Sequence, residues 1–373
     1  MQGKTALVLG GGGARAAYQI GVLKAIVEDY PRSQSIPFKI LCGSSAGAIN
    51  ATSLATHASC FHLGVKKLDW VWRNFETHHV YQSSISGVIK HMAKMGLKGL
   101  QANTINPEAG SLFDNQPLRN LLDKLMDFKR IDLNIERDAL TALCVDASCY
   151  NDSKSISFFQ SNIAMDGWKR SRREGIKTTL YTNHLLASSA IPLVFPSIKL
   201  NQKFYGDGSV HQLAPLSSAI HLGAEKILVI NLDKPQQDKV KALNNHPSTA
   251  NIAGHLLDTI FSDTLNSDLE RIERVNKTIK LIPEGKRSEY ALKPISTLVL
   301  KPSEDISKIA ARYYYHMPIA VRLLLRTFGI TQGSDSSIIS YLLFEKAYTQ
   351  ALIDLGYQDG LNRKGEILAF IEK

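Results

Sequence analysis

Short apolar runs that end in glycine or serine dominate the first part of the chain. Two of them, residues 5–9 and 38–42, each lead into a turn that contains glycine. The residues after each turn, 16–26 and 48–55, space their apolar positions as helices do. The pattern therefore predicts two consecutive strand–turn–helix units in residues 1–60, and such units build parallel sheets.

The same pattern continues further along the chain. Residues 61–138 are predicted to be mostly helical and are a candidate cap over a site, while the polar stretch 234–250 is predicted to be a loop. Further strands are expected at residues 140–145, 156–159, 226–230 and 296–300, with a short strand ending at Asp207. We therefore expect a three-layer α/β/α fold with a central, mostly parallel sheet. Residues 1–232 would form the catalytic domain, and residues 233–373 a mainly helical C-terminal extension packed on it.

The second turn reads Gly-Ser-Ser-Ala-Gly over residues 43–47. It matches the Gly-x-Ser-x-Gly elbow and stands between a strand and a helix, as that motif requires. Gly43 and Gly47 lack the Cβ atoms that would block so sharp a turn, and Ser45 lies at the start of the helix. Ser45 is therefore a candidate nucleophile, although a tight structural turn would have the same sequence.

The first turn is a run of glycines whose bare backbone N–H groups suit an anion. We predict that the N–H groups of Gly11, Gly12 and Gly13 stabilise an oxyanion. The same residues also fit the dinucleotide fingerprint G-x-G-x-x-A. That fingerprint requires an acidic residue about 20 residues on, and the next strand carries none at its end. A purely structural glycine turn is the third interpretation.

A serine nucleophile needs a base. Asp207 is the stronger candidate, because it ends a short strand and lies between two glycines, although Gly-Asp-Gly is also a common turn. Several histidines lie downstream of the elbow, and none of those considered stands in a motif that marks it as catalytic. The histidines considered are His184, His211, His221, His246, His255 and His316.

Taken together, these motifs resemble those of the patatin-like phospholipases, particularly the bacterial branch. Residues 11–16 resemble the family's Gly-Gly-Gly-x-Arg/Lys-Gly motif, residues 43–47 its elbow, and residues 207–209 its Asp-Gly-Gly/Ala motif. The segment 187–196 is similar to the family's Ala-Ser-x-Ala-x-Pro…Phe-x-Pro sequence. Two residues depart from the pattern: Ala16 replaces a glycine, and Ser209 replaces Gly or Ala.

The resemblance implies a Ser–Asp dyad with Ser45 as nucleophile and Asp207 as base, and with no catalytic histidine, metal or cofactor. It implies hydrolysis of phospholipid or lysophospholipid esters through an acyl-enzyme. Arg15 is expected to fix the glycine loop, to meet the lipid phosphate or simply to form a structural salt bridge. Gly43, Gly47 and Gly208 are supporting motif residues. Because a solvated aspartate is a poor base, we expect desolvation to raise the basicity of Asp207.

Charge and composition add expectations about partners. A net charge of +10, with no nucleic-acid-binding motif, favours an anionic membrane surface over nucleic acid. Residues 88–100 and 306–328 mix apolar and basic positions and are candidate membrane-facing or core-covering helices. The chain has no long apolar run, and its four cysteines lack a metal or disulfide pattern. Because Met1–Lys4 leads directly into the first predicted strand, we expect no secretory signal peptide. We expect a cytoplasmic protein, with the inner membrane face as a candidate peripheral location. The sequence does not indicate the oligomeric state.

Two other functions remain open from the sequence. One is an α/β-hydrolase-type esterase with a histidine triad, although the elbow of that fold usually follows several strands rather than the second. The other is a catalytically inactive lipid-binding protein.

Overall fold

The computed structural model describes residues 4–88, 90, 111–212, 214–233, 252, 254, 258–259, 264–283, 286, 293–327, 329–332 and 337–372. The predicted loop at 234–250 and most of the amphipathic segment 88–100 lie outside these residues. The strands are β1 (Lys4–Leu9), β2 (Ile40–Ser44), β3 (Ala142–Cys149), β4 (Lys154–Ser161), β5 (Gly167–Arg170), β6 (Arg173–Lys177), β7 (Ile198–Leu200), β8 (Lys203–Asp207), β9 (Ala224–Ile230) and β10 (Ser296–Leu300). The α-helices are α1 (Ala17–Val27), α2 (Ala46–Thr56), α3 (Phe61–Arg73), α5 (Gln116–Leu125), α6 (Lys129–Glu136), α7 (Thr182–Ser188), α8 (Ser217–His221), α10 (Thr264–Leu281), α11 (Ile306–Arg312), α12 (Ile319–Thr327), α13 (Ile338–Leu342), α14 (Lys346–Asn362) and α15 (Lys364–Glu372). The 3₁₀ helices are η1 (Gly13–Ala16), η2 (Thr77–His79) and η4 (Tyr314–His316).

One mixed sheet runs through the molecule in the order β10-β9-β1-β2-β3-β4-β6-β5, with β8 on β3 and β7 on β8. The strands from β10 to β3 are parallel, whereas β4 and β8 both run antiparallel to β3. The predicted, mostly parallel central sheet is therefore confirmed. Since β1 and β2 pair in parallel, the glycine loop and the elbow that follow them emerge at the same edge.

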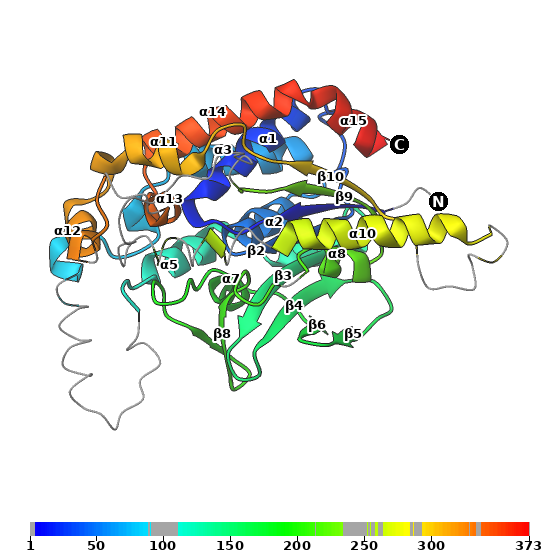
Figure 1. Cartoon of the computed structure of the whole chain (residues 1–373), viewed down its shortest axis with the longest axis horizontal. Coiled ribbons are helices and arrows are strands. Elements are labelled where there is room, and N and C mark those ends of the chain that lie inside the picture. The colour runs from blue at the N-terminus through cyan, green and yellow to red at the C-terminus, as the bar shows by residue number, and fades with distance from the viewer. Residues whose placement is uncertain are drawn as a thin grey trace.

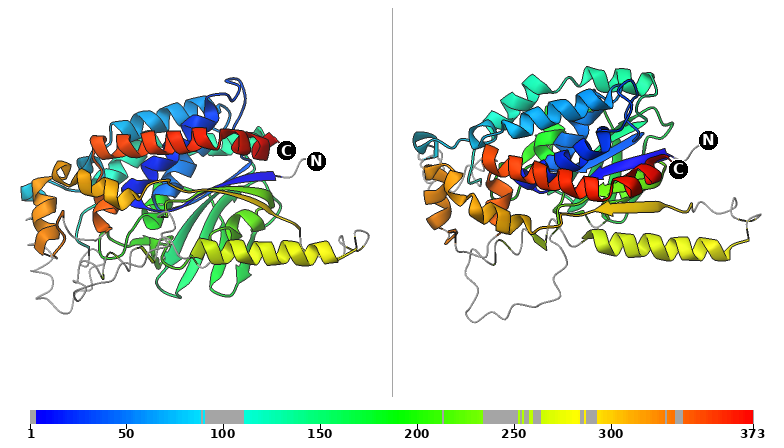
Figure 2. Two further views of the ribbon diagram at one scale, coloured as in Figure 1. Left: turned by 45° about the horizontal axis from the view of Figure 1, so that its top comes forward. Right: turned by 90° about the horizontal axis from the view of Figure 1, so that it is seen from above.

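Helices cover both faces of this sheet. Successive strand residues point to opposite sides, so Leu7 and Leu9 belong to one buried cluster and Ala6 and Val8 to another. The first cluster packs under α1, α2, α3 and α14, and the second under α8 and α10. Figures 1 and 2 show α1, α3 and α14 on one face of the sheet and α10 on the other. The layers are those of the expected α/β/α fold.

The C-terminal part is joined closely to the rest of the chain. β10 extends the sheet beside β9, and α14 lies along α1 (Figure 1). Tyr18 on α1 donates a hydrogen bond from its hydroxyl to Asp359 on α14 at 3.0 Å. As a result α1 is buried on nearly all sides, and not only along the face predicted from its apolar spacing.

Candidate active site

The register of β3 brings the predicted serine and aspartate together. β2 pairs with β3 only as far as Ser44 opposite Asp146. There the elbow turns away, and β8 takes the vacant edge of β3, with Asp207 opposite Ala147. Ser45 and Asp207, although 162 positions apart (207 − 45), are therefore neighbours at the end of the sheet.

Ser45 adopts the strained backbone that a nucleophile elbow requires. Its φ of 53° and ψ of −131° lie outside the regions that side-chain-bearing residues normally occupy, and it directly precedes helix α2. Gly47 lets this turn close against β1, since a Cβ there would lie 2.2 Å from the carbonyl oxygen of Leu9. The hydroxyl of Ser45 is thus presented at a helix N-terminus, where negative charge is favoured.

The C-terminal end of α7 and the residues just after it hold both residues in place. The N–H of Ser45 donates to Ser188 Oγ at 2.9 Å, and that hydroxyl donates to the carbonyl oxygen of Asp146 at 2.6 Å. The N–H of Asp207 donates to Ala190 O at 2.9 Å. The segment that the sequence analysis identified only as a motif upstream of Asp207 therefore positions both members of the predicted pair.

Asp207 is fully buried and poorly satisfied. Burial raises its pKa to about 6, while hydrogen bonding from the Ser45 side chain, and from Ser209, acts in the opposite direction. Oδ1 accepts the N–H of Ser209 at 3.0 Å. Oδ2 is buried without a full hydrogen bond from any described residue, while the Ser45 side chain lies close enough to the carboxyl to lower its pKa. The expected desolvation is present, and the unsatisfied oxygen is well placed to accept a proton from a nearby donor.

The glycine loop presents unengaged N–H groups beside this pair. No described residue accepts a hydrogen bond from the N–H groups of Gly11, Gly12 or Gly13. Gly13 has a φ of 55°, and a Cβ there would lie 2.3 Å from the carbonyl oxygen of Tyr341. The N–H of Ala46, which follows the serine, is also without an acceptor among these residues. The elbow motif itself implies that donor, although our sequence analysis did not assign it.

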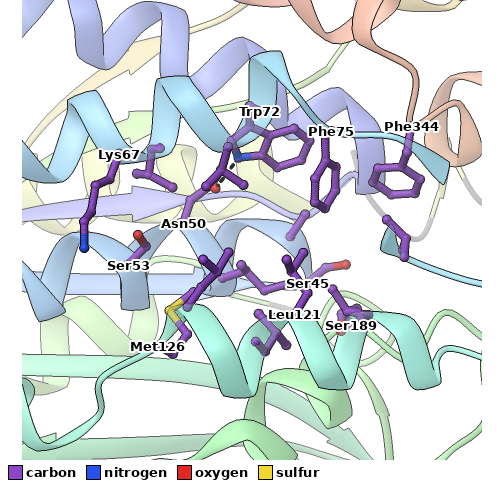
Figure 3. Close-up of a pocket in the computed structure, with 18 of the residues that line it drawn as sticks. Ser45, Asn50, Ser53, Lys67, Trp72, Phe75, Leu121, Met126, Ser189 and Phe344 are labelled. Atoms are coloured by element: carbon purple, nitrogen blue, oxygen red, sulfur yellow. Dashed lines mark hydrogen bonds between the residues drawn. The ribbon is translucent and has the colours of Figure 1, made fainter. Parts of the chain in front are cut away.

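Two buried amides connect the glycine loop to the elbow helix. Gln19 Nε2 donates to Gly10 O at 2.8 Å, and its Oε1 accepts from Asn50 Nδ2 at 2.9 Å. Asn50 Oδ1 in turn accepts the indole N–H of Trp72 at 2.8 Å, the dashed contact in Figure 3. This network spans α1, α2 and α3, so it fixes the loop relative to Ser45.

Arg15 turns away from the site and into the C-terminal part of the chain. Its guanidinium donates to Ser340 Oγ at 2.7 Å and to Tyr341 Oη at 3.0 Å, and it lies 3.8 Å from the centroid of the Tyr341 ring. It also pairs with Asp258 at 3.3 Å. Of the three roles considered, these contacts match fixing of the loop and a structural salt bridge. With its side chain 5% exposed and so engaged, Arg15 is not placed to meet a lipid phosphate.

A second carboxylate, which the sequence analysis did not select, lies next to Asp207. Asp146 is also fully buried, and burial raises its pKa to about 6. Its oxygens accept hydrogen bonds from Ser157 Oγ at 2.6 Å and from Gln212 Nε2 at 2.8 Å, with a weaker one from Cys144. No local motif marks Asp146, and only the strand register reveals its position.

Histidines take no part in this arrangement among the described residues. His184 Nδ1 accepts the N–H of Tyr181 at the start of α7, and burial lowers its pKa to about 4. His221 Nδ1 contacts Ser217 O and His57 Nδ1 contacts Ser53 O. No described histidine makes a hydrogen bond to Ser45 or Asp207, while His246 and His255 lie outside the described residues.

An apolar cavity of about 400 Å³ begins beside Ser45 and extends between α3 and α5. In Figure 3, Ser45 and Ser189 lie toward one end, and Lys67 and Met126 toward the other. The wall between them is almost entirely hydrophobic, and this volume is within the usual range for a ligand site of roughly 300 to 1,000 Å³. The lining includes Gly13, Ile49, Val71, Trp72, Phe75, Val80, Leu118, Leu121, Leu122, Leu125, Ile191, Phe195 and Phe344.

A comparison with protein families matches residues 7–220 to the patatin-like phospholipases. This match covers more than half of the chain and includes the glycine loop, the elbow and Asp207. The chain belongs to the patatin-like phospholipase family. Membership supports a lipid ester hydrolase, and the resemblance seen in the sequence is confirmed.

The two departures from the family motif have identifiable surroundings in this patatin-like protein. Ala16 is fully buried within the core cluster under α1, and its carbonyl oxygen accepts a hydrogen bond from Asn50 Nδ2 at 3.3 Å. Ser209 lies against Asp207, and its hydroxyl as well as its N–H act to lower the pKa of that carboxyl. Ser209 thus adds a polar contact to the candidate base.

Solved structures show more distant similarity to this family member. VipD from Legionella pneumophila is 12% identical with a TM-score of 0.34, over 95% of this chain and 67% of that one. Human GIVD cytosolic phospholipase A2 is 9% identical with a TM-score of 0.47, and the match covers 99% of this chain and 60% of that one. ExoU, a type III effector of Pseudomonas aeruginosa, is 13% identical with a TM-score of 0.38, and the match covers 99% of this chain and 54% of that one. The chain therefore spans about half to two thirds of their lengths. Comparison with curated proteins gives no match.

Two further observations concern the described residues alone. They include no group of three or more His, Cys, Asp or Glu side chains placed to hold a metal ion. None of their helices combines the length and the apolar character that crossing a bilayer demands.

Proposed function

We propose that this chain hydrolyses acyl esters of phospholipids or lysophospholipids, with Ser45 as nucleophile and Asp207 as general base. One observation carries the proposal: the Ser45 side chain contacts a buried, under-bonded carboxylate at the end of an apolar cavity. The carboxylate, its raised pKa and the cavity together supply what ester hydrolysis by a serine requires.

In the first half of the reaction, Ser45 Oγ attacks the ester carbonyl while its proton passes to Asp207. The negative charge that develops on the carbonyl oxygen meets the N–H groups of Gly11, Gly12 and Gly13, with Ala46 as a further donor. The C–O bond to the alcohol then breaks, the alcohol takes the proton from Asp207, and an acyl-enzyme remains. Each oxyanion donor typically contributes about 100- to 1,000-fold to the rate.

In the second half, water attacks the acyl-enzyme and transfers a proton to Asp207. The tetrahedral intermediate collapses, the fatty acid leaves, and Ser45 recovers its proton. Because Asp207 returns to its starting state after each half, the cycle needs no other acid or base.

The cavity favours a long acyl chain over a small polar ester. Its lining is predominantly apolar, and each methylene group that leaves water contributes about 0.8 kcal/mol to binding. A basic net charge of +10 also fits an enzyme whose lipid substrates lie in an anionic membrane. We accordingly propose a cytoplasmic enzyme that acts peripherally at an anionic membrane.

The substrate class is tested by incubating the protein with a panel of diacyl phospholipids, lysophospholipids and monoglycerides, and identifying the products by mass spectrometry. We expect free fatty acid from phospholipid or lysophospholipid, and none from the Ser45→Ala variant. Fatty acid release by that variant, or hydrolysis confined to non-lipid esters, would contradict the proposal.

A histidine triad is the rival mechanism, and single replacements distinguish it. Each of the candidate histidines, together with His57 in the cavity wall, is changed to Ala in the full-length chain. We expect every variant to keep measurable activity, because no described histidine contacts the proposed pair. If replacing one histidine lowered the activity as much as Ser45→Ala does, the result would favour a histidine triad over the dyad.

A further inference from the structure

Helix α3 carries an unusual combination of side chains on its exposed face. Leu63, Lys66, Lys67 and Trp70 follow one another at the i, i+3, i+4 and i+7 spacing, so they lie along one stripe. Leu63 is 41% and Trp70 is 66% exposed. The opposite side of the helix is buried in the core. Exposed tryptophan beside lysine is typical of side chains that lie at the headgroup level of a membrane.

The cavity that begins at Ser45 opens within this stripe. All four residues line it, together with Leu125 at the end of α5, which is 38% exposed. Figure 3 shows Lys67 at the end of the cavity away from Ser45, and the right view of Figure 2 places α3 and α5 along one side of the molecule. We refer to Leu63, Lys66, Lys67, Trp70 and Leu125 as the α3 surface.

The charge of the α3 surface is positive and is not neutralised by ion pairs within the described part of the chain. Lys66 and Lys67 form none there, while Asp69, the single acidic residue of α3, is already paired with Lys24 at 3.1 Å and Arg73 at 2.9 Å. Burial lowers the pKa of His57 in the cavity wall, and the charge of Lys67 contributes in the same direction. An anionic surface facing α3 would therefore meet unpaired positive charge.

We propose that the α3 surface docks on an anionic phospholipid bilayer, and that a lipid acyl chain enters the cavity through the opening it surrounds. This inference rests on the proposed lipid hydrolase function, which it extends by naming the surface. Leu63, Trp70 and Leu125 would enter the headgroup region, and Lys66 and Lys67 would face lipid phosphates. An apolar chain would then pass from the membrane to Ser45 without crossing water.

A bilayer fits these features better than a protein partner does. A protein would bury the exposed side chains but would leave the apolar cavity behind them without an occupant. A bilayer supplies both an anionic surface for the lysines and apolar chains for the cavity, and each lysine near it would strengthen binding about fivefold.

The tryptophans provide a direct measurement. Of the three in the chain, Trp72 and Trp168 are buried, at 5% and 8% exposure, so Trp70 alone faces solvent. The full-length Ser45→Ala variant is titrated with phosphatidylcholine vesicles with or without phosphatidylglycerol. We expect a blue shift of fluorescence with the anionic vesicles, quenching by lipids brominated on their acyl chains, and loss of both signals in Trp70→Phe.

Variants on two different helices locate the surface, with binding measured by vesicle sedimentation. Lys66→Gln with Lys67→Gln should require about 30-fold more anionic lipid for half-binding. The control is α12, another exposed amphipathic helix, whose Leu323 is 56% exposed and does not line the cavity. Leu323→Ser with Arg326→Gln should bind the vesicles as tightly as the Ser45→Ala protein in which all these changes are made. Thermal unfolding confirms that each variant is folded.

Three results would overturn the proposal: no binding to anionic vesicles, binding without a change in Trp70 fluorescence, or binding lost in the α12 variant and kept in the lysine variant. The hydrolase function fails separately, through absence of fatty acid release by the unmodified chain, because the vesicle assays use a protein that lacks the nucleophile.

Discussion

Two buried carboxylates lie side by side at the end of the sheet, and the surroundings of each give it a different role. Asp146 and Asp207 occupy neighbouring strands, and burial raises the pKa of both to about 6. Both oxygens of Asp146 accept hydrogen bonds, from Ser157, Gln212 and Cys144. In Asp207, only Oδ1 accepts a full hydrogen bond from a described residue, and Oδ2 is buried without one, while the Ser45 side chain lies close enough to influence the carboxyl.

The difference shows that the number of hydrogen-bond donors, and not burial alone, separates an anchor from a base. Asp146 is positioned to tie β3 to the turn after Asp207, because Gln212 belongs to that turn. Asp207 keeps one oxygen available to receive a proton. A carboxylate left under-bonded in a buried site costs stability, and active sites commonly carry such a cost.

The largest expected contrast is in activity. Asp207→Asn removes the proton acceptor and should lower kcat by roughly 100- to 10,000-fold. Asp146→Asn should lower it on the order of tenfold, about the effect of losing one hydrogen bond to a charged group. Steady-state hydrolysis of one phospholipid by both variants measures the contrast. Equal losses would show that the two carboxylates do not differ in role.

Stability should separate the same two variants. The pKa of Asp207 is higher in the folded protein than in the unfolded chain. Its protonated carboxyl therefore stabilises the fold at a pH below the pKa of the unfolded chain, and this contribution is lost as the pH rises through about 6. Asp207→Asn avoids this loss and should raise the free energy of unfolding at pH 8 by up to about 3 kcal/mol. Asp146→Asn should raise it less, because a donor left buried without an acceptor costs about 1 to 3 kcal/mol.

Chemical denaturation between pH 4 and pH 8 checks this prediction. The gain of the Asp207 variant over the unmodified protein should grow from pH 4 to about pH 6 and then level off. If Asp207→Asn were less stable than the unmodified chain at pH 8, the Asp207 carboxylate would have to accept more hydrogen bonds than its surroundings indicate.

The pH dependence of the reaction should follow Asp207. Below about pH 6 this residue is protonated and cannot accept the Ser45 proton, so kcat/KM should rise with pH and level off above that value. This rise of kcat/KM on the acid side of the profile, the acid limb, should persist in Asp146→Asn with nearly the same midpoint pH. Disappearance of the limb in that variant would assign it to Asp146.

The smallest effect concerns Ser209, where the chain departs from its family. Its hydroxyl lowers the pKa of Asp207, so Ser209→Ala should move the acid limb to higher pH while keeping the plateau rate within a few-fold. A pH–rate profile of the variant beside the unmodified chain measures the shift. Movement toward lower pH would show that the hydroxyl donates elsewhere.

Local motifs were enough to predict part of this structure. The two strand–turn–helix units and the turns that carry Gly13, Ser45 and Asp207 were predicted, because apolar runs and glycines mark them directly. β5 and β6 were not predicted, since they are short, only partly buried and rich in charged residues. The role of Asp146 was also missed, because it depends on which strands pair and no nearby residue indicates it.

Long-range contacts explain the remaining differences. Arg15 meets Ser340 and Tyr341, more than 300 residues away, so its surroundings could not be deduced from the glycine loop. The division at residues 232 and 233 stays a prediction, and β10 beyond it belongs to the same sheet as β1. The assignment of catalytic roles to Ser45 and Asp207 likewise awaits experiment.

Covalent labelling tests the central claim most directly, because it reports a nucleophile without requiring the natural substrate. The folded protein is treated with a fluorophosphonate, and the modified residue is identified by mass spectrometry. We predict a single label on Ser45 that is absent in Ser45→Ala and forms at least about 100-fold more slowly in Asp207→Asn. Labelling at another residue, no labelling of the folded chain, or an unchanged rate in Asp207→Asn would contradict the account.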